Sequence, residues 1–228
     1  MKIAVISDIH GNSSALKELF SSLSKFEHIV FCGDIVGYYY NVSEVLADLQ
    51  KLDVKLIKGN HDQMLLDVLD KKVDLELITQ RYGHGISIAI QNMTSEQVSY
   101  LRQLPEQIKI KINGKKICIS HGSPLDANEY VYPDSFSAHE QIAALTDDIF
   151  ILGHTHYPMN ISMGNKLIVN PGSVGQSRDY DSRASWGELD LQTMQFVIHR
   201  VSYNQTELLK QIEKYDSDLP FLREVLLR

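Results

Sequence analysis

The chain has 228 residues, of which 43% are hydrophobic and 22% are charged, so long disorder and a fibrous architecture are excluded. A net charge of -7 disfavours binding to a nucleic-acid duplex, which needs a basic surface, and any phosphate chemistry must therefore import positive charge. The two cysteines lie in apolar runs, which fits reduced, packed thiols better than a disulfide framework and excludes a zinc knuckle.

The first 60 residues alternate between strand and helix patterns. Short apolar runs predict strands at Lys2–Ile6, His28–Phe31 and Val54–Ile57. Directly after them come three polar residues, namely Asp8, Asp34 and Asn60. Between the strands, helical periodicity predicts helices at 13–25 and 42–52, the second opened by a capping box of Asn41 and Glu44. This order predicts a parallel sheet, in which ligands gather beyond the carboxyl ends of the strands.

Residues 62–105 carry helical periodicity and no clear strand pattern. A Thr94…Gln97 capping box and a stop at Pro105 support this reading. We expect a helical insertion that overhangs the carboxyl ends of the strands.

The second half of the chain reads as more antiparallel. Asn113-Gly114 predicts a two-residue hairpin between strands at 107–112 and 115–120, and Gly164-Asn165 predicts another. Further strands are expected at 149–152, 166–169, 184–190 and 195–201, and closing helices at 205–215 and 219–227. The chain is therefore expected to form a single α/β domain over 1–228, a four-layer α/β/β/α sandwich of two mixed sheets with the helical insertion.

Five short motifs place ligand-type side chains at the predicted strand ends. They are Asp8-Ile9-His10, Gly33-Asp34, Gly59-Asn60-His61-Asp62, His121-Gly122 and Gly153-His154-Thr155-His156. Alternate residues on an extended segment face the same way, so Asp8 and His10 can point into one site. Five of the nine histidines lie in these motifs, which core packing would not arrange.

The order of these motifs resembles the calcineurin-like metallophosphoesterase superfamily. The Asn170–Gly175 and Leu101–Pro105 runs resemble its small prokaryotic, YfcE-like phosphodiesterase branch. The resemblance implies metals at the carboxyl ends of the strands, and hydrolysis of small phosphodiesters or phosphomonoesters by attack of a metal-bridging hydroxide. It implies that Asp34 bridges two ions and that each ion has its own set of further ligands. These sets are Asp8, His10 and His156 for one ion, and Asn60, His121 and His154 for the other. The resemblance also implies that His61 contacts the phosphate or protonates the leaving oxygen.

The expected cofactors are two divalent ions. Oxygen and nitrogen ligands without thiolate suit manganese, iron, zinc, cobalt or nickel, and manganese is the first expectation. Asp62, next to His61, is expected to orient that imidazole.

One departure from the superfamily concerns the residues after Gly33-Asp34. Protein phosphatases continue there with an Asp-Arg pair, whereas this chain has Gly37-Tyr38, which disfavours the protein-phosphatase and the symmetric dinucleoside tetraphosphatase readings. Arg178 is a candidate replacement for phosphate binding, although an ion pair with Asp179 or Asp181 explains it as well. Tyr38, Tyr39 and Tyr40 are open to base stacking or to plain packing.

Two alternatives remain beside the phosphoesterase reading. One is asymmetric hydrolysis of a dinucleoside polyphosphate, and the other is a non-catalytic interaction scaffold. The expected partner is a small phosphoester or nucleotide, with no duplex nucleic acid, and the formation of a homodimer is left open. No apolar run approaches the roughly 20 residues that span a bilayer, and a cytoplasmic location is expected.

Overall fold

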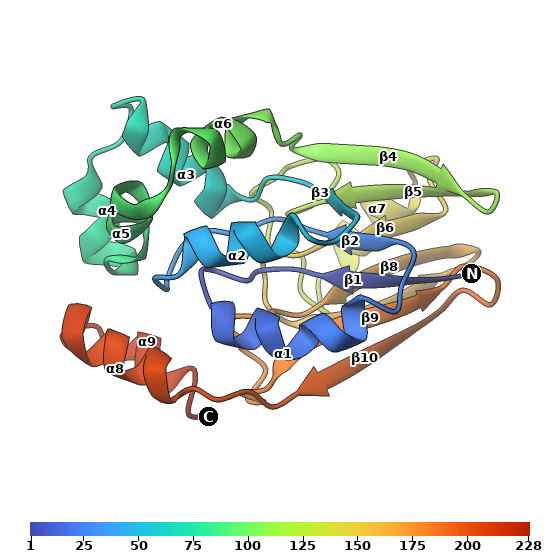
Figure 1. Ribbon diagram of the computed structural model, residues 1–228. Helices are drawn as coiled ribbons and strands as arrows, with labels where there is room; N and C mark the ends of the chain where they lie inside the picture. Colours follow the sequence, from blue (N-terminus) through green and yellow to red (C-terminus); the bar gives the residue numbers. More distant parts are fainter.

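The fold is built on two five-stranded sheets packed face to face, in a computed structural model that describes residues 1–228 (Figure 1). Both sheets are mixed, because each has three neighbouring parallel strands, with antiparallel pairs on one side of them in the first sheet and on both sides in the second. The first sheet runs in the order β10 (Gln195–Val201), β9 (Ala184–Asp190), β1 (Lys2–Ile6), β2 (Ile29–Phe31) and β3 (Val54–Leu56). The second runs in the order β4 (Gln107–Ile112), β5 (Lys115–Ser120), β6 (Ile149–Ile151), β8 (Lys166–Pro171) and β7 (Pro158–Met163).

Strand alternation divides the core into layers. In β1, Ile3 and Val5 face the second sheet, while Ala4 and Ile6 face helices α1 (Ser13–Leu23) and α2 (Val42–Leu49). Helix α7 (Phe136–Ala143) covers the outer face of the second sheet. The four-layer α/β/β/α sandwich of two mixed sheets is therefore confirmed, although α7 had no counterpart among the expected elements.

Two groups of helices lie at the end of the sandwich where the parallel strands end (Figure 1). The first group is α3 (Asn60–Leu69), α4 (Leu75–Tyr82), α5 (Gly85–Asn92) and α6 (Ser95–Gln103), and the second is α8 (Thr206–Tyr215) and α9 (Phe221–Glu224). The first group is the expected insertion, but it begins two residues earlier than expected, so Asn60 lies in the first turn of a helix. The assignment of all 228 residues to one domain stays a prediction.

Local hydrogen bonds confirm two expected features. Asn113 and Gly114 both have positive φ, at 50° and 81°, and join β4 to β5 in the two-residue turn that their sequence predicts. The Gln97 amide donates to Thr94 Oγ1 and the Thr94 amide donates to Gln97 Oε1, which completes the expected capping box of α6.

The expected capping box at α2 is wrong. The Asn41 side chain makes no capping bond to α2 and pairs instead with the side chain of Gln211 in α8. Glu44 accepts from Lys17 of α1 at 2.7 Å. Both side chains found partners on neighbouring helices, which a local pattern does not reveal.

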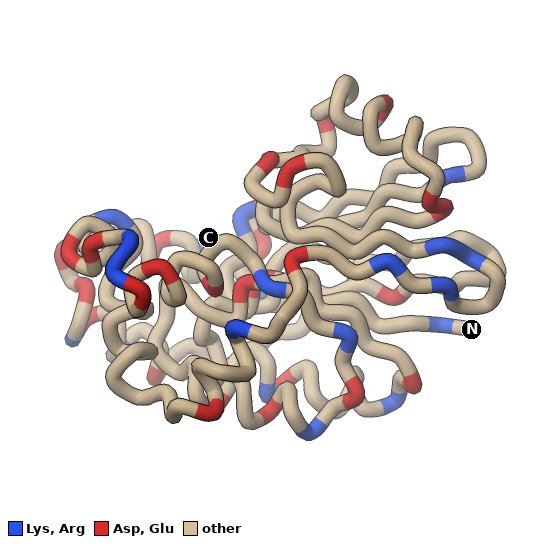
Figure 2. The backbone as a smooth tube through the Cα atoms, turned by 90° about the horizontal axis from the view of Figure 1, so that it is seen from above, with Lys and Arg blue, Asp and Glu red and all other residues tan.

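The charged residues are mixed over most of the surface (Figure 2). The hairpin of β4 and β5, at the end of the sandwich opposite the insertion, carries four lysines, namely Lys109, Lys111, Lys115 and Lys116. Separately, none of the helices has both the length and the apolar character that crossing a bilayer requires.

A buried carboxylate ties the C-terminal helices to the insertion. Asp216 follows α8, is 1% exposed and accepts from the Tyr40 hydroxyl at 2.7 Å. It also accepts from the His84 amide at 3.0 Å and its ring Nδ1 at 2.7 Å. One side chain therefore joins three segments that are far apart in the sequence.

We expect Asp216→Ala to lower the free energy of unfolding by about 3 kcal/mol, because it leaves the Tyr40 hydroxyl and the His84 amide without their acceptor. Urea denaturation measures this change. Asp218→Ala is the control, since that side chain is exposed and the free energy should hardly change. An equal effect of both variants would contradict the role of Asp216.

Candidate metal centre

The seven expected ligand side chains converge with that of His61 beyond the carboxyl ends of the parallel strands. The structure brings their ligand atoms together in groups that span less than 4.8 Å, namely Asp8, His10 and His156; His10, Asp34 and His61; and Asp34, His121 and His154. Asn60 joins them through its Oδ1, which lies 2.9 Å from His121 Nε2. Every residue expected in the ligand set is therefore near this one centre.

The backbone of this centre is held in an uncommon conformation. Five non-glycine residues have φ between 50° and 67°, namely Asp8, His10, Asp34, His154 and His156. The left-handed region costs side-chain-bearing residues free energy, and such residues gather at functional sites. The sequence motifs gave no direct sign of this feature.

Three imidazoles of the centre share one orientation. Each ring donates its Nδ1–H to a backbone carbonyl, which directs Nε2 into the centre. The pairs are His10 with Val36 at 2.8 Å, His121 with Cys32 at 2.7 Å and His156 with Gln176 at 2.6 Å. Metal-binding histidines in proteins are usually oriented in this way.

The contact between His10 and His156 calls for a cation. Their Nε2 atoms lie 3.0 Å apart, and burial lowers the pKa of both rings well below the usual value, so both are neutral. Since Nδ1 carries the proton in each ring, two lone pairs face one another and no hydrogen bond joins them. A metal ion held by both nitrogens would resolve this contact, so the residues present fit the divalent ions that the sequence implies.

Asp34 lies at the middle of the centre. Its Oδ2 is 3.6 Å from His10 Nε2 and 3.3 Å from His121 Nε2, so one oxygen faces both groups of ligands. Its Oδ1 accepts from the His61 amide at 2.8 Å, which fixes the carboxylate. Gly59 permits this approach, because a Cβ there would lie 2.1 Å from Asp34 Oδ1.

The electrostatics of the centre also favour bound positive charge. Burial raises the pKa of Asp8 to about 7, and its Oδ1 has no hydrogen-bond partner. Burial lowers the pKa of His121, but the neighbouring Asp34 and Asp8 carboxylates outweigh it and raise the value to about 10. Carboxylates this deeply buried are stable only when a cation or hydrogen bonds compensate their charge.

The His61 ring packs beside the ligands His10 and Asp34. Its ring centroid lies 4.9 Å from that of His10, and its Nδ1 is buried without a partner. Gly37 covers both rings, because a Cβ there would lie 2.6 Å from His10 Nδ1 and 2.7 Å from His61 Nδ1. The glycine that replaces the phosphatase aspartate is therefore required by close packing.

The expectation that Asp62 orients the His61 ring is wrong. The Asp62 carboxylate accepts from three backbone amides, those of Asp34, Val36 and Gly59, each at 2.9 Å. It caps the start of α3 and joins this helix to the loop after β2. Asp62 thus supports the backbone of the centre and makes no bond to the imidazole.

Arg178 reaches the centre from the loop between β8 and β9. Its Nη2 donates to the Tyr38 hydroxyl at 2.8 Å and to Gln176 Oε1 at 3.0 Å. It makes no ion pair with Asp179 or Asp181, which pair with Arg200 and Arg183 instead, so the alternative of a plain ion pair is wrong. Its charge also contributes to lowering the pKa of His156.

The three consecutive tyrosines have different surroundings. The Tyr38 ring lies 4.7 Å from His10 and 4.8 Å from His61, so it forms a wall of the centre. All three tyrosines belong to one buried cluster with the C-terminal helices. Packing therefore explains Tyr39 and Tyr40, and Tyr38 combines packing with its place beside the centre.

Two further side chains contribute to this region; sequence reasoning named Asn170 only as part of a run that resembles the family, and it missed Tyr130. Asn170 Nδ2 donates to the Gly153 carbonyl and to Thr155 Oγ1, so the turn after β8 braces the loop that carries His154. Tyr130, half exposed, places its ring 3.9 Å from the ring of His154. Tyr130 carried no signal in the sequence, because its loop has no regular pattern.

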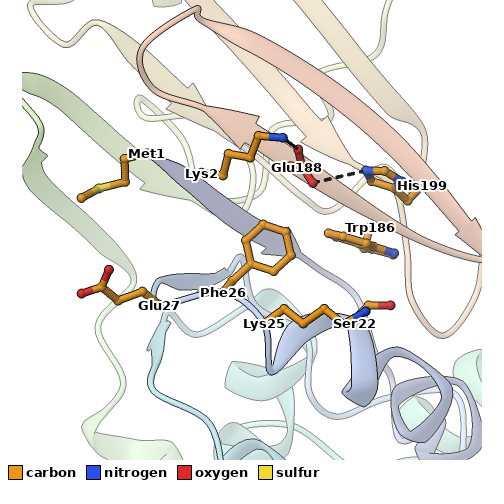
Figure 3. Close-up of a pocket in the computed structure, with 9 residues that line it drawn as sticks. All are labelled: Met1, Lys2, Ser22, Lys25, Phe26, Glu27, Trp186, Glu188 and His199. Atoms are coloured by element: carbon orange, nitrogen blue, oxygen red, sulfur yellow. Dashed lines mark ion pairs between the residues drawn. The ribbon is translucent and has the colours of Figure 1, made fainter.

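Two hollows differ in their relation to the ligands. A small one of about 110 Å³ is lined by Asn60 and His121 together with Lys58 and Gln63, and gives access to the centre. A larger one of about 670 Å³ lies near the chain start, where Phe26 and Trp186 form its walls (Figure 3). No residue of the ligand set lines the larger hollow, so it is separate from the candidate centre.

Comparisons with known proteins agree with this geometry. Residues 1–194 match the calcineurin-like phosphoesterase superfamily domain. The uncharacterized protein MJ0912 of Methanocaldococcus jannaschii is 32% identical over 93% of this chain and 92% of its own length. A metallophosphoesterase from Sphaerobacter thermophilus has a TM-score of 0.80 at 28% identity, covering 100% of this chain and 98% of its own.

The hypothetical protein PH1004 from Pyrococcus horikoshii has a TM-score of 0.83 at 23% identity, covering 99% and 96% of the two chains, which is a likeness of fold. YfcE-like phosphoesterases are also among the structural neighbours. The seven-residue centre, the two mixed sheets and these matches agree, and the chain belongs to the calcineurin-like phosphoesterase superfamily.

Proposed function

We propose that this protein is a dinuclear, metal-dependent hydrolase of small phosphodiesters or phosphomonoesters. The observation that carries the proposal is the approach of His10 Nε2 and His156 Nε2 to 3.0 Å, with both Nδ1 protons already donated to carbonyls. A fold that kept these residues only for packing would not set two buried lone pairs against each other.

The residues divide into two ligand groups that share Asp34. Asp8, His10 and His156 would hold one ion, and Asn60, His121 and His154 the other, with manganese as the expected metal. Two divalent ions supply Lewis acidity and an activated water for attack on phosphorus. His61 then contacts the phosphate or protonates the leaving oxygen, and Arg178 binds a phosphate oxygen beside Tyr38.

The surroundings of the centre favour small substrates. Gly37 and Tyr38 stand where protein phosphatases have an aspartate and an arginine, so the clamp for a doubly charged monoester is absent from that loop. Tyr38 and Tyr82 instead place two rings beside His61. These rings favour asymmetric hydrolysis of a dinucleoside polyphosphate as the second candidate, whereas a complete ligand set argues against a scaffold.

We expect a chelator to abolish hydrolysis and manganese to restore it. The measurement is kcat/KM for four substrates under one metal condition: a nitrophenyl diester, its matching monoester, a dinucleoside tetraphosphate and a phosphopeptide. Elemental analysis counts the metals in the same samples. Full activity of metal-free protein would contradict the two-metal proposal, and a preference for the phosphopeptide would contradict the substrate class.

A further inference from the structure

Two arginines near the candidate centre lack acidic partners. Of the seven arginines in the chain, four form ion pairs with carboxylates, namely Arg102, Arg183, Arg200 and Arg223. Arg81, Arg178 and Arg228 make no such pair; Arg228 lies over the Tyr180 ring, whereas Arg81 and Arg178 lie near the candidate centre on elements that are far apart in the sequence. A guanidinium without a carboxylate partner is free to bind an anion from solution.

Both of these arginines lie against the rings that surround His61. The Arg178 guanidinium lies 5.6 Å from the centre of the Tyr38 ring, and that of Arg81 lies 5.0 Å from the Tyr82 ring. The two tyrosine rings are 6.1 Å apart and each lies within 5.0 Å of His61. The two positive charges therefore approach His61 from the loop after β8 and from α4.

The insertion holds Arg81 in this place. Helix α4 ends at Tyr82, and the next two residues, Gly83 and His84, contact the buried Asp216. Asp216 also accepts from Tyr40, in the segment that carries Tyr38. The end of α4 and the Tyr38 loop are thus fixed relative to one another, and less ordering is needed when an anion binds between their side chains.

We propose that Arg81 and Arg178 together bind an anionic group on the leaving side of the substrate, which favours the second candidate, a nucleotide-type polyphosphate with at least two adjacent phosphates, over a simple diester. This inference rests on the proposed hydrolase and on the placement of His61 at the leaving oxygen. The fork of each guanidinium matches two phosphate oxygens, and the half-buried Tyr82 ring, with the Arg81 guanidinium over it, lies beside this site.

Binding of inorganic anions to the metal-loaded protein tests the anion site of Arg81 and Arg178, here called the arginine clamp, without turnover. Isothermal titration should show that tripolyphosphate binds more tightly than orthophosphate. Arg81→Gln should weaken tripolyphosphate binding about tenfold and orthophosphate binding much less, as expected for the loss of one charge-assisted hydrogen bond. Arg102→Gln is the matched control, since Arg102 lies on α6 in the same insertion and pairs with Asp70.

Turnover then separates this inference from the proposed function. In Arg81→Gln, the ratio of kcat/KM for a dinucleoside tetraphosphate to that for a nitrophenyl diester should fall about tenfold, mainly through KM. Equal loss for both substrates, or equal weakening of both inorganic anions, would overturn the clamp and leave the hydrolase intact. Tighter binding of tripolyphosphate without hydrolysis of any phosphoester would overturn the hydrolase instead.

Discussion

Asp34→Asn is expected to lose bound metal and hydrolysis together. One oxygen of Asp34 faces His10 and His121 at 3.6 and 3.3 Å, so the substitution removes a charge shared by both groups of ligands. The other oxygen accepts from the His61 amide, and an asparagine carbonyl can keep that bond, so the fold should be retained. Replacing a residue that only supports a metal ligand lowers metal affinity about 10- to 100-fold. Replacing a ligand shared by both groups should therefore lower metal affinity further.

The measurement combines a titration of manganese with kcat/KM for the nitrophenyl diester. The control is Asp190→Asn, because Asp190 ends β9 beside the start of β1, at the end of the strands opposite the candidate centre. Circular dichroism confirms that both variants remain folded. Wild-type metal content in Asp34→Asn would show that Asp34 is not the shared ligand.

The arrangement of the candidate centre could be predicted because it follows from strand geometry. Asp8, Asp34 and Asn60 each come directly after a short apolar run, and parallel strands bring their carboxyl ends to the same edge of a sheet. The structure places all three beside one another, as expected. An apolar run followed by a polar residue is a local pattern, so the position of these three residues can be predicted from the sequence alone.

Other parts of the centre depend on contacts that no local pattern contains. Asp62 follows His61 in the chain, yet its carboxylate points to the amides of Asp34 and Val36 because the start of α3 meets the loop after β2. Arg178 lies beside two aspartates in the sequence, yet its guanidinium turns to Tyr38. Where loops from different strands meet, the hydrogen-bond partners of a side chain could not be predicted from its neighbours in the sequence.

His61→Gln should separate chemistry from metal binding. The ring lies beside the ligands with a buried, unpartnered Nδ1, and burial lowers its pKa to about 4, so the ring is neutral and carries one N–H. A glutamine fills similar space and keeps the backbone amide that holds Asp34, but it cannot act as an acid or base. We expect kcat to fall by about 10² to 10⁴, as for other general acid-base groups, while both ions stay bound.

Elemental analysis and kcat measured on the same preparation decide between the two roles of this histidine. His28→Gln is the matched control, because His28 precedes β2 at the other end of the strand and should leave kcat and metal content unchanged. The experiment can decide, because a ring nitrogen of His61 lies within 4.8 Å of the ligand atoms of His10 and Asp34 and could itself bind a metal. If the glutamine variant loses an ion along with its activity, His61 is itself a ligand and the leaving oxygen must receive its proton from another group.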